Sequence, residues 1–172
     1  GESHGPVLVA ILEGLPAGLN INVEAIQSGM MRRWEVPGRG PRAKFETDAL
    51  SLLSGVKNCV TLGSPLAFQI GNGDSRIDEL PNLTAPRPGH ADLAGVLRNR
   101  NRDIRAVLER ASARETAART AVGEVARALL GHFGIEISLG NLFLLSSSKL
   151  HLPPKGLPSL SINIPDFLRT SL

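Results

Sequence analysis

Residues 109–134 read ERASARETAARTAVGEVARALLGHFG, and this stretch carries the clearest local signal in the chain. Ser112, followed three residues later by Glu115, has the pattern of a capping box, which satisfies main-chain N–H groups at the start of a helix. Apolar residues then recur on one helical face: Val122, Val125 and Leu129. Gly134 stands where a helix commonly ends. The pattern predicts an amphipathic helix over residues 113–132.

The start of this helix is also a candidate anion site. A helix N-terminus presents main-chain N–H groups without partners and the positive end of the helix dipole. Arg110 precedes the cap and Arg114 lies in the first turn, so two guanidinium groups flank the same point. The segment fits a cradle for phosphate or carboxylate. It fits equally an ordinary capped helix whose arginines lie in water.

The composition favours a globular protein with an aliphatic core. The chain has 172 residues, of which 42% are hydrophobic and 3% aromatic, and a single domain is the default at this length. It contains no apolar run of about eighteen residues, the length that indicates a membrane-spanning helix. The single cysteine, Cys59, excludes an internal disulfide and suits a reducing compartment. Because it lies in a strand-like run, we expect it to be a small core residue.

Arginine is concentrated in two parts of the chain, although the net charge is only +3. The two clusters are Arg32, Arg33, Arg39 and Arg42, and Arg98, Arg100, Arg102, Arg105, Arg110 and Arg114. Arginine binds phosphate and carboxylate groups in a bidentate manner, so the clusters indicate a small polyanionic ligand or a polynucleotide, with a solvated basic surface as the alternative. The aromatic residues and modules typical of nucleic-acid binding are missing. The histidine spacing does not favour a metal site.

Short local patterns predict the remaining elements. Asn22 is a suitable N-cap for a helix whose apolar residues recur over residues 23–34. Two β-prone runs, 56–62 and 65–70, are joined at Gly-Ser-Pro and are interpreted as a hairpin. Two further elements are expected: a strand over residues 6–13 and a helix from residue 91 to about residue 108.

Three polar motifs stand outside these elements. GESHG, residues 1–5, contains His4, which is either a site residue or an unimportant end residue. PRPGHAD, residues 86–92, holds His90 in a loop stiffened by prolines, where it is either a proton donor or a loop histidine bonded to a carbonyl. GRGPR, residues 38–42, would let Arg39 approach a ligand closely, or is merely flexible.

Taken in order, these motifs resemble one family. GESHG, then RR with GRGPR, then SGV, TLGSP and NGD, then RPGHAD and ERASARETA closely resemble the N-terminal half of chorismate synthase, from Gly1 to about Gly134. The resemblance implies an α+β fold with a β-α-β sandwich core, here incomplete. It divides the chain into an N-terminal half-domain, residues 1–134, and a divergent tail, residues 135–172.

The resemblance also implies an activity. The family converts 5-enolpyruvylshikimate 3-phosphate to chorismate, the last common step of the shikimate pathway, by anti-1,4-elimination of phosphate. It requires reduced FMN, which is reduced either by the enzyme with NADPH or by a separate reductase. Its members are cytoplasmic, or plastid in plants, and form homotetramers. Neither a nucleic acid nor a membrane is expected as a partner.

Residue roles follow from the same resemblance. The substrate-binding arginines correspond to Arg33, Arg39, Arg87 and Arg114, and the FMN-contacting stretch corresponds to Arg110, Ala111 and Ser112. His4 and His90 correspond to the two active-site histidines. We place His90 on the side of the leaving phosphate and His4 on the side of the flavin. No metal is implied.

The sequence also departs from the family pattern. The tail from about Ser138 does not follow it, and GESHG stands at the first residue, which implies that Gly1 is a truncated beginning. The family chain is about twice as long, and its second half carries further FMN contacts and an acidic residue. The alternatives to an active enzyme are a non-catalytic fragment that only binds phosphorylated ligands and, more remotely, a basic nucleic-acid-binding module.

Overall fold

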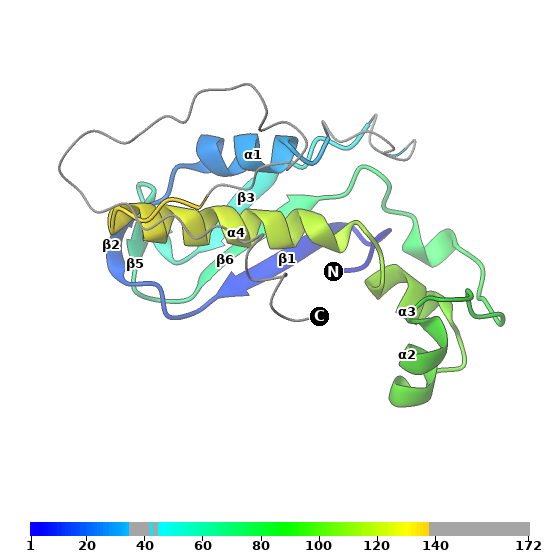
Figure 1. Ribbon diagram of the computed structural model, residues 1–172. Coiled ribbons are helices and arrows are strands. Elements are labelled where there is room, and N and C mark those ends of the chain that lie inside the picture. Colours follow the sequence, from blue (N-terminus) through cyan, green and yellow to red (C-terminus); the bar gives the residue numbers. More distant parts are fainter. Residues whose placement is uncertain (35–41, 43–44, 138–172) are drawn as a thin grey trace, which may run out of the picture. The chain divides into compact units, whose positions relative to one another are not determined.

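The computed structural model of the protein describes residues 1–34, 42 and 45–137. The chain divides into two compact units, Gly1–Glu124 and Val125–Leu172. Among its described residues, the first unit contains two small sheets, three α-helices and the start of a fourth (Figure 1). The predicted tail from residue 138 and most of the GRGPR loop, Arg39 included, lie outside the described residues.

The first sheet is antiparallel, with the strand order β1-β6-β3. Its strands are β1 (Val7–Leu12), β6 (Leu66–Gly71) and β3 (Leu50–Ser54). β1 confirms the strand predicted over residues 6–13. Side chains of a strand alternate between faces, and one face carries the fully buried residues Leu8, Leu66, Phe68 and Ile70. This face therefore supplies much of the core of the first unit.

The second sheet has the order β2-β5-β4 and shows that the predicted hairpin was wrong. Its strands are β2 (Ala17–Asn20), β5 (Val60–Leu62) and β4 (Val56–Lys57). Residues 56–62 form a hairpin within themselves, and β6 pairs in the other sheet. Asn58 and Cys59 make the turn with φ of 51° and 61°. Cys59 is exposed, so its predicted place in the core was wrong.

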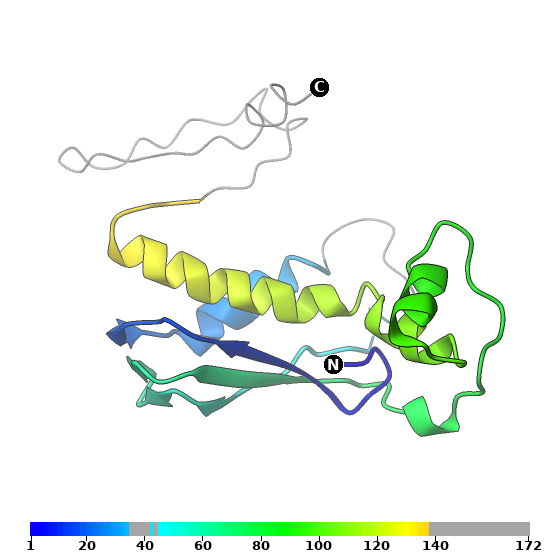
Figure 2. The same ribbon diagram turned by 90° about the horizontal axis from the view of Figure 1, so that it is seen from below.

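Helix α1 (Val23–Met31) begins as the sequence predicts and ends three residues earlier. The side chain of Asn22 accepts a hydrogen bond from the main-chain N–H of Ala25 at 2.9 Å, which confirms the N-cap. Its buried face contains Ile26 and Met30. Together with the start of α4, α1 covers one face of the first sheet (Figure 2).

Helices α2 (Asp92–Asn99) and α3 (Arg105–Arg110) replace the single helix predicted from residue 91 to about residue 108. The chain leaves the helical path at Arg100, whose φ of 52° is left-handed. A left-handed residue cannot continue a right-handed α-helix. The connection before α2 carries a short 3-10 helix, η2 (Ile77–Glu79).

Helix α4 (Glu115–His132) is the predicted long helix and begins two residues later than expected. Its first turns bury Ala117, Ala118 and Ala121. It ends in a Schellman motif: Gly134 has a φ of 73°, and Ile135 donates to the carbonyl of Leu130 at 3.0 Å. In the described part of the chain, no helix has the length and apolar character needed to cross a membrane.

Candidate active site

The first five residues of the chain are tied to several other elements. The side-chain amide of Asn72, which follows β6, donates to two carbonyl oxygens of this segment at 2.7 and 3.2 Å. The main-chain N–H of Ile77 donates to the carbonyl of His4 at 3.0 Å. The segment is therefore an ordered part of the first unit, and His4 is not a frayed end residue.

His4 is held by the carboxylate of Glu109, near the end of α3. Its main-chain N–H donates to Glu109 Oε2 at 2.9 Å, and its Nδ1 lies 2.9 and 3.1 Å from the two carboxylate oxygens. The Glu109 side chain is fully buried, whereas His4 is partly exposed. The other ring nitrogen, Nε2, lies 3.6 Å from Asp74 Oδ2.

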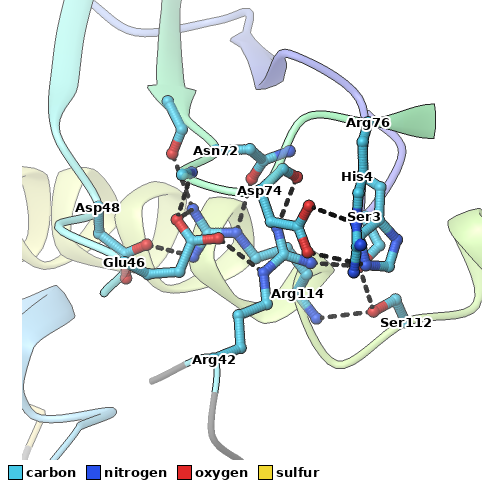
Figure 3. A network of polar contacts seen from close by, with 12 residues as sticks. Ser3, His4, Arg42, Glu46, Asp48, Asn72, Asp74, Arg76, Ser112 and Arg114 are labelled. Carbon is cyan, nitrogen blue, oxygen red and sulfur yellow. Dashed lines mark hydrogen bonds and ion pairs between the residues drawn. The ribbon is translucent and has the colours of Figure 1, made fainter. Parts of the chain in front are cut away.

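Three arginines and two carboxylates form a network beside this histidine, and Figure 3 shows Arg42, Glu46, Asp48 and Arg114 of this network. We refer to Arg33, Arg42, Glu46, Asp48 and Arg114 as the arginine–carboxylate network. Asp48 pairs with Arg33 at 2.9 Å and also with Arg114. Glu46 pairs with Arg42 at 2.6 Å and with Arg114 at 3.3 Å. Three guanidinium groups thus face two carboxylates, which leaves one positive charge in excess.

Arg114 is the centre of the network. Its side chain also donates to the Asn72 side-chain oxygen at 2.7 Å and to the carbonyl of Gly71 at 2.9 Å. Arg33 is similarly buried and donates to Thr116 Oγ1 at 2.9 Å. Both guanidinium groups are therefore held within the protein, so any anionic ligand that reaches them competes with Asp48 and Glu46.

The two network carboxylates are buried. Burial alone would raise the pKa of Glu46, but the hydrogen bond from the main-chain N–H of Gly73 and the guanidinium groups of Arg42 and Arg114 outweigh it. The pKa of Glu46 therefore lies below its usual value. Asp48 has a φ of 49°, a left-handed conformation that aspartate tolerates better than most residues.

Two serines connect the network with the start of α4. Ser3 Oγ accepts from Arg42 at 2.9 Å and from Ser112 Oγ at 3.0 Å. Ser112 Oγ in turn accepts from the main-chain N–H of Arg114 at 3.2 Å. The carboxylate of Glu115 lies 3.4 Å from Arg110. Ser112 thus accepts a main-chain N–H at the start of α4, as a cap does, but from Arg114, and the Glu115 side chain pairs with Arg110. The reciprocal capping box was therefore wrong, although the capping role of Ser112 is confirmed.

The PRPGHAD loop forms a second group of site candidates. Arg87 donates to Asp92 through Nε and Nη2, both at 2.8 Å, and its Nη2 lies 3.0 Å from His90 Nδ1. The same ring nitrogen lies 3.4 Å from Asp92 Oδ1, so a guanidinium donor and a carboxylate acceptor both face Nδ1 of His90. The hydrogen bond from Arg87 is the main cause that holds the pKa of Asp92 well below its usual range.

The structure brings together some of the residues chosen from sequence and groups others separately. His4, Arg33, Ser112 and Arg114 contact the network or its immediate partners. Arg110 donates to the carbonyl of Gly1 at 2.9 Å, and Ala111 caps α3 beside it. Arg87 and His90 contact each other and Asp92, whereas Arg39 lies outside the described residues.

Several residues of the site were missed in the sequence. They are Ser3, Arg42, Glu46, Asp48, Asn72, Asp74 and Glu109. Ser3 and Glu109 stand inside the quoted motifs GESHG and ERASARE, and Asn72 and Asp74 stand in GNGD. Arg42 ends the motif GRGPR and belongs to the first arginine cluster. Position within a motif was thus the available signal for five of them, whereas Glu46 and Asp48 stand in no motif.

The arrangement can bind and orient anions. Guanidinium and hydroxyl groups beside the start of α4 are donors suited to phosphate and carboxylate. Two histidines with assigned hydrogen-bond partners are available for proton transfer. Among the residues that the structure describes, no group of three or more His, Cys, Asp or Glu side chains is placed to hold a metal ion.

Comparison with known proteins identifies the family. The sequence model of chorismate synthase matches residues 1–145. The chain is 48% identical over 155 residues to a chorismate synthase of Micrococcus luteus, covering 80% of this chain and 38% of that protein. It is 46% identical over 176 residues to one of Desulforudis audaxviator, covering 95% and 45%.

A solved structure agrees with the sequence comparison. A crystal structure of chorismate synthase superimposes with a TM-score of 0.59 at 45% identity, over 78% of this chain and 33% of that one. This likeness confirms the predicted fold class. The site thus lies in a protein of a lyase family, and the chain belongs to the chorismate synthase family. It spans less than half the length of the curated relatives described here.

Proposed function

We propose that the protein acts in the chorismate synthase reaction, the anti-1,4-elimination of phosphate from 5-enolpyruvylshikimate 3-phosphate to give chorismate, with dependence on reduced FMN. The observation that carries the proposal is the meeting of His4, Ser112 and the arginine–carboxylate network at the start of α4. In a chain of this family, this cluster of residues offers hydrogen-bond donors for anions. It also contains a histidine that is held in place by its hydrogen-bond partners.

The substrate in this proposal carries a phosphate and two carboxylates. Arg33, Arg39, Arg87 and Arg114 would offset these charges, as charge-assisted hydrogen bonds to guanidinium groups do. Arg33 and Arg114 already donate to Asp48. To bind the substrate, these two arginines would have to donate to it in addition to Asp48, or release Asp48 when the substrate enters.

The two histidines would have separate roles. With Nδ1 of His90 accepting from Arg87, Nε2 would carry the hydrogen that is donated to the departing phosphate. His4 would act on the flavin side, held by Glu109 and facing Asp74 through Nε2. A proton donor placed at a leaving group typically contributes about 10²–10⁴-fold to the rate.

The residues at the start of α4 fit the cofactor. Arg110 has a half-exposed side chain and lies at the turn formed with Ala111 and Ser112, where its guanidinium group donates to the carbonyl of Gly1. A guanidinium group at this turn suits the phosphate group of FMN. When bound, reduced FMN supplies electron density to the allylic system of the substrate. Its electrons would come from NADPH or from a separate reductase.

The same proposal covers the organisation of the chain. Residues 1–134 would be the N-terminal half of the catalytic domain, and residues 135–172 a segment that diverges from it. The active assembly would be a cytoplasmic homotetramer, as the family resemblance implies. Its ligands would be the enolpyruvyl substrate and FMN.

A chimera tests the activity. Residues 1–134 of this chain would be joined to the C-terminal remainder of the Micrococcus luteus relative, and chorismate formation measured anaerobically with reduced FMN. We expect turnover, a loss of about 10²-fold or more in His90→Ala, and no loss in the control His132→Ala, at the exposed end of α4. A folded chimera without turnover, beside an active Micrococcus luteus enzyme, would contradict the proposal.

A further inference from the structure

Glu109 makes more bonds to the start of the chain than one structural contact requires. Its main-chain carbonyl accepts from the N–H of Ser3 at 3.0 Å. Its carboxylate accepts from the N–H of His4 at 2.9 Å and lies within 3.1 Å of the ring Nδ1 through both oxygens. One residue of α3 thus fixes the main chain and the ring of His4, which is 105 positions away.

The bond to the ring determines which nitrogen carries the hydrogen. An ionised carboxylate can only accept, so Nδ1 of His4 must be the donor. In the neutral ring, Nε2 is then the nitrogen without a hydrogen. It lies 3.6 Å from Asp74 Oδ2, which is longer than a hydrogen bond, and the Asp74 carboxylate is paired with Arg76 at 3.0 Å. A neutral imidazole in water prefers the opposite form, with the hydrogen on Nε2. The contact with Glu109 therefore selects the less common tautomer.

Burial makes this contact necessary for Glu109 as well. A buried carboxylate without hydrogen-bond donors is strongly unfavourable. Beyond the two donors of His4, Arg105 lies beside this carboxylate in the described part of the chain, with its Nη1 3.7 Å from Glu109 Oε1. Arg105 also donates to the carbonyl of Pro81 at 3.0 Å, so its side chain is anchored elsewhere. His4 is thus the main donor to this carboxylate.

We propose that Glu109 is a positioning residue of the site, which holds His4 with the hydrogen on Nδ1 and presents Nε2 toward Asp74. The consequence for catalysis rests on the proposed function, in which His4 acts beside the flavin. The geometry itself does not rest on it. A purely structural latch between α3 and the chain start would need only the two main-chain bonds, and it would leave the ring free to choose its tautomer.

The test is the tautomer of His4 in the 172-residue chain. Histidine would be labelled with ¹⁵N, and long-range ¹H–¹⁵N spectra recorded at a pH where the ring is neutral. The His4 signals would be identified by their loss in His4→Gln. We expect the Nδ1 signal in the range of a protonated nitrogen and the Nε2 signal in the range of an unprotonated one. A hydrogen on Nε2 in the wild-type chain would overturn the proposal without any Glu109 variant.

Variants then separate positioning from folding. Glu109→Gln keeps the shape of the side chain, but glutamine has one acceptor oxygen and an NH2 group that donates. The main-chain N–H and Nδ1 of His4 would then no longer both find an acceptor. We therefore expect the ring to shift toward the form with the hydrogen on Nε2. Glu109→Asp keeps the charge and should retain the wild-type form. The matched control is Glu124→Gln, which removes a carboxylate paired with Arg32 and should not change the His4 signals.

The outcomes distinguish this inference from the proposed function. An unchanged His4 tautomer in a folded Glu109→Gln chain would overturn the positioning role. A chimera that forms no chorismate contradicts the proposed function and leaves the tautomer measurement intact. A changed tautomer together with an active chimera supports both.

Discussion

Arg87 donates from Nε and Nη2 to the two carboxylate oxygens of Asp92, with both distances at 2.8 Å. The main-chain N–H of Arg87 adds a third hydrogen bond at 3.0 Å. The Asp92 side chain has no exposed surface, although it begins a helix at the protein surface. The loop that carries His90 is therefore closed by one ionised pair, and its integrity should depend on the charge of Asp92.

This dependence predicts the response to acid. The pKa of Asp92 in the folded chain lies below the unfolded value of about 4. The ionised pair therefore stabilises the fold above about pH 4, and its contribution is lost as the pH falls through the folded pKa. We expect Asp92→Asn to lower the free energy of unfolding by a constant amount at higher pH and by less below about pH 4.

Urea titrations at a series of pH values measure this difference between wild type and Asp92→Asn. The control is Asp78→Asn, which changes an exposed carboxylate in η2 and should show no such pH dependence. A difference that grows as the pH falls would contradict the interpretation, because the sign of the pKa shift requires it to shrink.

Two glycines in helices should respond to alanine in opposite directions. A Cβ at Gly95 in α2 would lie 2.4 Å from Val107 Cγ1, so Gly95→Ala should destabilise the fold by about 1–3 kcal/mol. A Cβ at Gly123 in α4 would meet no described atom within 4 Å, so Gly123→Ala should stabilise by about 0.5–1 kcal/mol. Urea unfolding of both variants measures the contrast.

The Gly95 effect has an internal control. The double variant Gly95→Ala, Val107→Ala removes the methyl group that the new Cβ would meet. We expect it to be more stable than the sum of the two single effects, since residues in contact are not additive. Strict additivity would show that close packing of α2 on α3 is not the cause.

The parts of the fold that the sequence predicts correctly are those with local signals. α4, β1 and the Asn22 cap depend on residues within a few positions of one another, and so on propensity and periodicity. The hairpin was wrong because the pairing of β6 with β1 and β3 is a long-range choice. The break at Arg100 was missed because a single left-handed residue decides it.

The candidate site divides along the same line. The histidines, the arginines and Ser112 stand in motifs and were chosen from them. The roles assigned to these residues stay predictions. Two of the carboxylate pairings join distant parts of the chain: Asp48 is 66 positions from Arg114, and Glu109 is 105 positions from His4. These pairings depend on how strands and helices pack, so a single sequence gives no local sign of them, whereas Asp92 is only five positions from Arg87.

The turn between β4 and β5 offers a stabilising substitution. Asn58 and Cys59 both have positive φ, as a two-residue type I′ turn requires. Glycine adopts this conformation without the steric penalty of a Cβ, and Asn-Gly is a favoured pair for such turns. We expect Cys59→Gly to raise the free energy of unfolding by about 1 kcal/mol. Cys59→Ala, which loses the thiol but keeps the Cβ, should bring no gain, and an equal gain in both would contradict the argument.

The largest loss of stability should come from the network itself, at Asp48. Its carboxylate pairs with both Arg33 and Arg114, and all three side chains are largely buried. Removing one charge from a buried group of this kind leaves guanidinium groups without full compensation. We expect Asp48→Asn to lower the free energy of unfolding by about 3 kcal/mol, measured by urea titration at neutral pH.

Asparagine is the informative replacement at this position because it also tolerates the left-handed φ of 49°. The loss would therefore report the charge and not the backbone. Asp78→Asn, the exposed control, should stay within about 0.5 kcal/mol of wild type. In a double-mutant cycle with Arg114→Met, the double variant should lose less free energy of unfolding than the two single variants combined. Each single substitution leaves the other charge without its partner, whereas the double variant removes both members of the ion pair. A double variant that is strictly additive would mean that Asp48 stabilises the fold by some route other than its ion pair with Arg114.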